Sequence, residues 1–103
     1  MIPHLSAEQL EQSRKAAAQA RHKRAVFKQR LRCGELVFGE ALEIARKDEV
    51  LSRMKVTSLL RTMPRVGEKR AVALMERHTI APSRRIRGLG KHQLEALRTE
   101  FPQ

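Results

Sequence analysis

A glycine turn beside basic side chains is the part of this sequence best suited to binding chemistry. The stretch PRVGEKRA occupies positions 64–71. Pro64 has no amide hydrogen and ends a preceding helix, whereas Gly67 lets the backbone come close to a ligand. The first amides of the next helix lack internal partners, so the turn predicts an anion site that a backbone phosphate would fill. The residues expected to contact DNA here are Arg65, Val66, Gly67, Lys69 and Arg70. An ordinary helix turn is the alternative interpretation.

A cluster of arginines forms a second candidate site in RRIRGLG, at 84–90. Three guanidinium groups surround Ile86, which we expect to be a buried anchor. Arginines are favoured in narrow minor grooves, where the negative potential is strongest. The expected DNA contacts are Arg84, Arg85, Arg87, Gly88 and Lys91. We expect this cluster and the amides at Gly67 to form one cradle for phosphate. In the alternative, the turn is solvated and its arginines pair with Glu95 or Glu100.

A stripe of positive charge marks the N-terminal region and gives a possible second DNA contact. Three of its members recur every seven residues, which places them on one side of a helix. The stripe consists of Arg14, Arg21, Arg24, Lys28 and Arg32. A merely solvated helix face explains it equally well.

Residue patterns of enzymes and metal proteins are missing from the sequence. His4, His22, His78 and His92 lack ligand spacing with one another or with Cys33. No nucleophile–base pair, paired carboxylates or phosphate-binding loop occurs. We therefore expect no catalysis, no metal and no cofactor. No signal peptide or membrane-spanning run is found, and the single cysteine cannot form an internal disulfide, which together favour a cytoplasmic protein.

The charge balance indicates a polyanionic partner. The 103 residues include 22 Lys and Arg against 11 Asp and Glu, a formal charge of +11. Residues 1–34 hold eight basic and two acidic side chains, residues 35–63 five of each, and residues 64–103 nine basic and four acidic. The middle segment is therefore expected to be scaffold and the two ends contact surfaces.

Helical signals run through the whole chain, and only three aromatic residues are present. Ser6 and Gln9 form a capping box that opens a long helix, which Gly34 ends. Thr57 is the expected N-cap of a later helix. Ala71, Leu74, Met75, Leu94, Leu97 and Phe101 fall at helical spacing and are expected to face the core. The pattern predicts an all-α fold, with a basic helical arm at 1–34 and a DNA-binding helical domain at 35–103.

Several segments together resemble a known family. KVTSLL at 55–60, PRVG at 64–67 and IAPSRRIRGLG at 80–90, with the alanine-rich basic N-terminal helix, are similar to the actinobacterial integration host factors. The resemblance implies a helix-two-turns-helix domain at about 55–103, like that of ribosomal protein S13. It also implies a monomeric, nucleoid-associated architectural protein, which could associate further on DNA. Such a protein binds double-stranded DNA with little sequence preference, bends and condenses it, and influences supercoiling and recombination.

Two other functions fit the same residues. The domain is shared with ribosomal protein S13, so an RNA-binding or ribosome-associated module is one alternative. A protein-binding adaptor whose charge is incidental is the other. The formamidopyrimidine-type DNA glycosylases share the domain too, but they use an N-terminal Pro-Glu and a zinc finger. This sequence begins Met1-Ile2-Pro3-His4 and has one cysteine, which argues against that activity.

Overall fold

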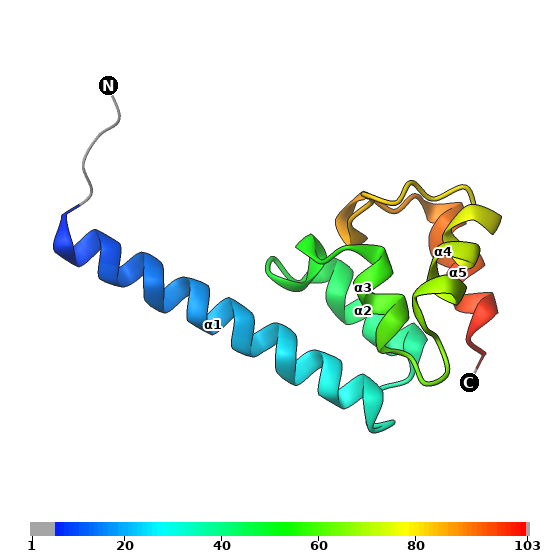
Figure 1. The fold of residues 1–103 in the computed structure, drawn as a ribbon, viewed down its shortest axis with the longest axis horizontal. Coiled ribbons are helices and arrows are strands. Elements are labelled where there is room, and N and C mark those ends of the chain that lie inside the picture. The colour runs from blue at the N-terminus through cyan, green and yellow to red at the C-terminus, as the bar shows by residue number, and fades with distance from the viewer. Residues whose placement is uncertain (1–5, 103) are drawn as a thin grey trace.

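The structure is a computed structural model that describes residues 6–102. In it, the protein consists of helices joined by short turns (Figure 1). The helices are α1 (Ala7–Arg32), α2 (Phe38–Lys47), η1 (Leu51–Arg53), α3 (Val56–Thr62), α4 (Glu68–Arg77), η2 (Ile86–Gly88) and α5 (Lys91–Glu100), where η marks a single 3-10 turn. The described residues form no strand, which confirms the predicted all-α class. None of these helices is long and apolar enough to cross a membrane.

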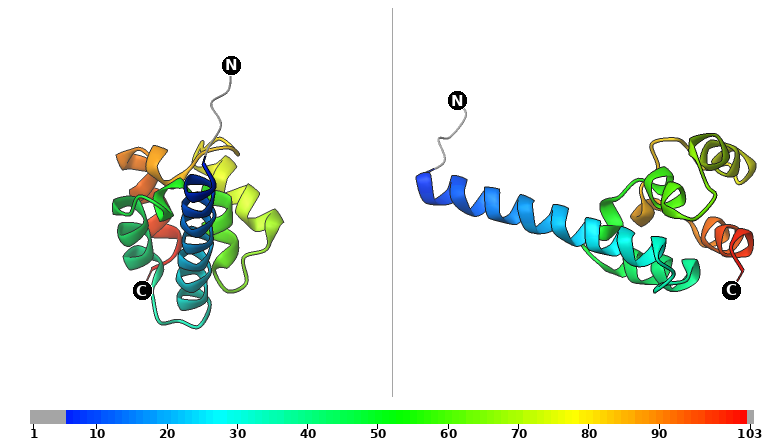
Figure 2. Two further views of the ribbon diagram at one scale, coloured as in Figure 1. Left: turned by 90° about the vertical axis from the view of Figure 1, so that its left-hand side faces the viewer. Right: turned by 60° about the horizontal axis from the view of Figure 1, so that its bottom comes forward.

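Helix α1 projects from the body as a long arm (Figures 1 and 2). The predicted capping box is present: the Gln9 amide donates to Ser6 Oγ at 3.1 Å, and the Ser6 amide donates to Gln9 Oε1 at 2.8 Å. All side chains from 6 to 19 are exposed, whereas Phe27 and Leu31 are buried. The arm is therefore anchored only near its C-terminal end. It stops as predicted at Gly34, which has a left-handed φ of 82°.

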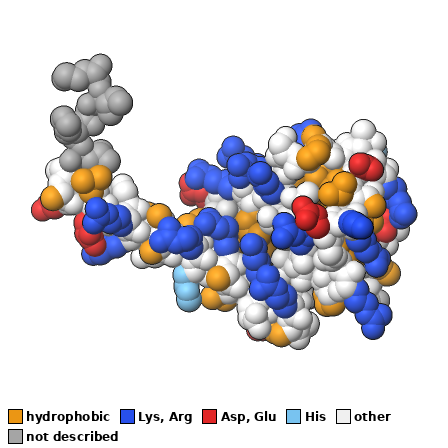
Figure 3. All heavy atoms as spheres, in the orientation of Figure 1, with side chains coloured by type: hydrophobic (Ala, Val, Ile, Leu, Met, Phe, Trp, Pro, Cys, Tyr) orange, Lys and Arg blue, Asp and Glu red, His pale blue; other side chains and the backbone are white. Residues whose placement is uncertain are grey.

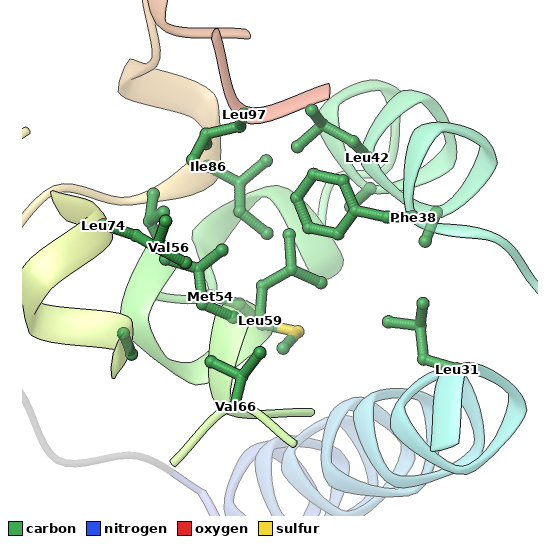
Figure 4. Packing of buried hydrophobic residues seen from close by; sticks show 14 of the residues in the cluster. Leu31, Phe38, Leu42, Met54, Val56, Leu59, Val66, Leu74, Ile86 and Leu97 are labelled. Atoms are coloured by element: carbon green, nitrogen blue, oxygen red, sulfur yellow. The ribbon is translucent and has the colours of Figure 1, made fainter. Parts of the chain in front are cut away.

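The core lies among α2, α3, α4 and α5, and the C-terminal part of α1 contributes Phe27 and Leu31 to it (Figure 4). Its largest fully buried members are Phe38, Leu31, Leu42, Leu59, Leu60, Met75, Ile86, Leu97 and Val56. The expected burial of Ala71, Leu74, Met75 and Leu97 is confirmed. Leu94 and Phe101 are half-buried. The Phe101 ring packs on Phe38 with centroids 4.5 Å apart.

The start of α3 differs from the sequence-based expectation. Thr57 is not the N-cap, because the helix already begins at Val56. The Val56 amide donates to the carbonyl of Arg84 at 3.0 Å, and the Ile86 amide donates to the carbonyl of Met54 at 2.9 Å. A distant segment thus satisfies the first of the free amides at the start of α3. These two bonds also fix the arginine cluster against the beginning of α3.

Candidate nucleic-acid interface

The turn between α3 and α4 holds its strained backbone at an unexpected residue. Arg65 has a φ of 66°, in the left-handed region, whereas Gly67 is extended with φ −88° and ψ −174°. The special geometry expected at Gly67 therefore falls on Arg65 instead. The Val66 amide closes the turn by donating to the carbonyl of Met63 at 3.1 Å. The Val66 side chain is buried in the core, so it positions the turn and does not face solvent.

The N-terminus of α4 presents free amides to solvent. Its hydrogen-bond ladder begins with the Ala71 amide donating to the Gly67 carbonyl at 3.0 Å. The amides of Glu68, Lys69 and Arg70 precede that bond and have no partner in the described part of the chain. Gly67 offers no capping side chain, and a Cβ there would have no atom within 4 Å. This open helix end, beside exposed Lys69 and Arg70, can bind an anion.

The arginine cluster surrounds a buried anchor, as expected. Ile86 is 1% exposed, whereas Arg84, Arg85 and Arg87 are exposed. The three arginines line one shallow hollow together with Ala81, Ser83 and Gly88. Each guanidinium carries five N–H donors, so most of them remain available to a ligand even where one is used within the chain.

Two arginines of the cluster are held in place by backbone carbonyls. Arg84 Nη1 donates to the Gly88 carbonyl at 3.0 Å. Arg85 Nη1 donates to the carbonyl of Arg53. Both contacts lower the conformational freedom that these side chains would lose on binding a phosphate.

The alternative in which Glu95 or Glu100 neutralises the cluster is wrong. Glu95 pairs with Arg98 at 3.3 Å. Glu100 Oε1 lies 3.1 Å from Arg77 Nη1 and 2.8 Å from His78 Nε2. The hydrogen bond with His78 is the main cause that lowers the pKa of the Glu100 carboxyl. Neither acid therefore contacts the arginine cluster.

Lys91 lies at a second glycine-capped helix start. It is the exposed first residue of α5, directly after Gly90. The Gly90 amide donates to Gln93 Oε1 at 3.0 Å, so one amide at this helix end already has a partner.

The α3–α4 turn and the arginine cluster do not form one cradle. The Arg84 carbonyl accepts a hydrogen bond from the amide of Val56, the first residue of α3. The turn before Gly67, in contrast, follows Thr62, the last residue of α3. The two groups thus lie at opposite ends of α3 (Figure 1), which is seven residues or about 10 Å long. The expected single cradle is replaced by two separate basic sites on one rigid helix.

Part of the basic stripe on α1 lies against the body. Arg24, Lys28 and Arg32 line two hollows between α1 and α3, whereas Arg14 and Arg21 lie on the exposed arm and line none of the hollows described. Basic side chains gather along α1 and over the neighbouring face of the body (Figure 3). The structure therefore joins three members of the stripe to the body and leaves two apart.

Three further basic residues line these hollows and were missed in the sequence. They are Arg53, Lys55 and Arg61. Residues 35–63 are neutral in total, which concealed them. All five acids of that segment precede residue 50, so dividing it there would have revealed a purely basic stretch around α3.

Residues 6–102 contain no group of three acidic, His or Cys side chains that could hold a metal ion. His4 lies outside the described residues. Cys33 is a free, exposed thiol at the end of α1.

Comparison with known proteins agrees with this geometry. Residues 31–101 match the S13-like H2TH domain. An integration host factor of Mycolicibacterium smegmatis is 43% identical over 102 residues, which cover 99% of this chain and 97% of the relative. The integration host factor of Mycobacterium tuberculosis is 43% identical over 100 residues, which cover 97% of this chain and 95% of the relative. That of Streptomyces coelicolor is 40% identical over 97% and 94%.

A solved structure matches as well. It is described as sIHF bound to an 8bp palindromic DNA, and it superposes with a TM-score of 0.82 at 41% identity. The match covers 85% of this chain and 99% of the other. The relatives match almost the full length, the solved structure 85% of the chain and the domain residues 31–101, so the chain belongs to the integration host factor family with an S13-like H2TH domain.

Proposed function

We propose that this protein is a non-enzymatic, nucleoid-associated protein that binds duplex DNA through its phosphate backbone and minor groove. The observation that carries the proposal is the likeness to sIHF, which was solved with DNA and shares the fold at a TM-score of 0.82. The proposed contacts are Arg65, Gly67, Lys69, Arg70, Arg84, Arg85, Arg87, Gly88 and Lys91, with Val66 supporting the turn. The domain at 35–103 carries them, and the arm at 1–34 adds charge.

Sequence-independent binding follows from the kind of donor that each site offers. Amides at a helix N-terminus and exposed lysines recognise phosphate, which is the same at every base pair. Arginines that enter a minor groove respond to its width and potential more than to base identity. Affinity should therefore depend strongly on salt and weakly on sequence.

The separation of the two sites favours bending. Both sites are fixed to the same rigid helix, α3. The protein therefore cannot flex to bring the two sites onto a straight duplex. Curving a duplex by tens of degrees costs about 1–6 kcal/mol, which added phosphate contacts can offset. We infer that a single chain bends DNA, that several chains condense it, and that supercoiling and site-specific integration respond to this.

An RNA-binding role remains the second candidate, because the matched domain is S13-like. Helix N-termini and arginines contact the phosphates of either nucleic acid. Competition between duplex DNA and a structured RNA at fixed salt separates the two functions. The DNA proposal expects the duplex to displace the RNA.

Binding to two duplexes of unrelated sequence, measured by fluorescence anisotropy across a salt series, tests the proposed function. If about six phosphates are contacted, log affinity should fall with log salt at a slope of about −5 on both. Ligase-catalysed circularisation of short DNA reports the bend. Absence of binding even in dilute buffer, or binding to one sequence alone, would overturn the proposal.

A further inference from the structure

Helix α1 divides its basic side chains between two flanks. In the left view of Figure 2, where α1 points at the viewer, α2 and α3 lie on opposite sides of it. On the α2 side, Lys23 forms an ion pair with Asp48, and its side chain lines a hollow that includes Ile44 of α2. On the α3 side, the lining residues are Arg24, Lys28 and Arg32, which follow one another at four-residue intervals.

The α3 flank has two adjoining hollows. One hollow, of about 360 Å³, is lined by Arg24, Lys28, Arg53, Met54, Lys55, Ser58 and Arg85. The next, of about 250 Å³, is lined by Lys28, Arg32, Ser58, Arg61 and Thr62. Lys28 and Ser58 belong to both, so the hollows adjoin, and neither is lined by an acid. We call these two hollows together the α1–α3 groove.

The basic side chains of the groove are largely unneutralised. Within residues 6–102, no acidic oxygen lies within 4.0 Å of Arg24, Lys28, Arg32, Lys55, Arg61 or Arg85. Arg53 alone has an acidic neighbour, exposed Glu49 at 3.5 Å. Some basic side chains outside the groove are paired; Arg46, Lys47 and Arg98, for example, all lie within 4.0 Å of a Glu43 carboxylate oxygen.

This distribution destabilises the free protein. Like charges four residues apart on a helix repel one another, and Arg24, Lys28 and Arg32 form two such pairs. Basic residues from α3 and its neighbouring turns then add to the same repulsion. A polyanion that occupies the groove would relieve this repulsion. Basic residues that serve only solubility are normally interspersed with acidic ones over the surface, instead of being concentrated in one groove.

The groove also connects with the arginine cluster. Arg85 lines both the larger hollow of the groove and the hollow of the cluster. From Arg24 to Arg32 the groove follows eight residues of helix, or about 12 Å. Phosphates of one strand recur every ~3.4 Å along the duplex axis and lie farther apart along the strand itself, so this length can accompany about two or three of them.

We propose that the α1–α3 groove binds the backbone of duplex DNA, as a continuation of the strand that passes the arginine cluster. This inference rests on the proposed DNA binding and extends it to a site made by the arm and the body together. The groove adds phosphate contacts from Arg24, Lys28, Arg32, Arg53, Lys55 and Arg61. It also makes the docked C-terminal part of α1 a component of the binding surface.

A charge-matched pair of variants tests the groove. The groove variant carries Arg24→Gln, Lys28→Gln and Arg32→Gln. The control variant carries Lys23→Gln, Arg30→Gln and Lys47→Gln, which removes the same charge from residues paired with Asp48, Glu35 and Glu43. Anisotropy is measured across a salt series with a duplex long enough to extend past both hollows.

The groove variant should lower the magnitude of the salt slope by about 2–3, because three phosphate contacts are lost. The control should keep the wild-type slope. Thermal unfolding separates binding from folding: without DNA, the groove variant should melt at or above the wild-type temperature, since repulsion is relieved. The control should melt lower, since its ion pairs are lost.

Each other result overturns the proposal. An unchanged salt slope in the groove variant shows that DNA does not enter the groove. Equal reductions of the salt slope in both variants show an effect of total charge alone. In either case the proposed DNA binding stands. A loss seen only with a structured RNA assigns the groove to RNA. Failure of the wild-type chain to bind the duplex removes the proposed function itself and this extension with it.

Discussion

The side chain of Arg84 lies directly over Gly88. Its Nη1 donates to the Gly88 carbonyl at 3.0 Å, and a Cβ on Gly88 would come within 3.0 Å of Arg84 Cδ and 3.3 Å of Nη1. A larger residue at position 88 would therefore displace the Arg84 side chain from its present position by a few tenths of an ångström. The arginine cluster and the glycine that follows it are therefore one structural unit.

Gly88→Ala should displace Arg84 and weaken DNA binding with little effect on folding. A flexible side chain can move aside, so the free energy of unfolding should change by less than about 1 kcal/mol, the net value of one hydrogen bond. The dissociation constant should rise about threefold to tenfold, up to the equivalent of ~1.4 kcal/mol. Gly90→Ala is the matched control, because its Cβ would meet Gln93 Oε1 at an ordinary 3.7 Å. Equal affinity of the two variants would contradict this role.

Removing two arginines of the cluster should weaken binding to all duplexes alike. Arg84→Ala with Arg85→Ala removes groove and phosphate contacts that carry no base code. Anisotropy with two unrelated duplexes should show about the same loss on each, with the salt slope reduced in magnitude by about 2. A loss confined to one sequence would instead indicate direct reading of bases.

Gly67→Asp should stabilise the fold while it weakens DNA binding. The extended backbone at Gly67 suits an N-cap, and an aspartate there would accept a hydrogen bond from an α4 amide. The free energy of unfolding in urea should rise by about 0.3–1 kcal/mol. The same carboxylate would occupy and repel the phosphate position, so the affinity for duplex DNA should fall at least about tenfold.

Gly67→Asn separates charge from capping, because it caps the helix without adding an anion. We expect it to retain more affinity than Gly67→Asp at low salt. Unaltered binding by the aspartate variant would exclude the α4 N-terminus as a phosphate site.

Local signals in the sequence predicted most of the elements and the anchor of the arginine cluster. Ser6 with Gln9, the stop at Gly34 and the burial of Ile86 depend on neighbouring residues, and the structure confirms all three. The start of α3 at Val56 was not predictable in this way, because its amide is satisfied by Arg84, far along the chain.

The arrangement of the basic residues in space was harder to predict. A single cradle was expected because Gly67 and Arg84 are both part of conspicuous motifs. Their separation depends on which end of α3 each one meets, and spacing along the chain does not encode this. Arg98 shows the same limit, since it reaches Glu43, 55 residues earlier, at 2.8 Å.

The fold should lose stability below about pH 5 through its lowered carboxyl pKa values. Hydrogen bonds, first from Arg46 and then from Lys47, lower the pKa of Glu43 from 4.5 to about 2. A hydrogen bond from Lys23 is the main cause that lowers the pKa of Asp48. Because both values lie below those of the unfolded chain, their stabilisation is fully present above the unfolded pKa. It is lost as pH falls through the folded pKa.

Thermal unfolding between pH 7 and pH 2 measures this effect. The melting temperature should be nearly constant above pH 5 and fall steadily below it. Glu43→Gln should melt lower than the wild-type chain at pH 7 and show a flatter decline towards pH 2, because one titrating group is gone. An identical decline in both proteins would show that Glu43 does not contribute.

Docking of α1 should depend on Phe27 far more than on its neighbour in sequence. Phe27 is 3% exposed and lies in the core, whereas Val26 is 44% exposed. Phe27→Ala should lower the free energy of unfolding by about 3–5 kcal/mol, the usual cost of emptying a buried aromatic site. Val26→Ala should change it by less than about 0.5 kcal/mol. Urea titrations followed by circular dichroism provide both values, and equal costs would mean that the arm is not anchored where the structure places it.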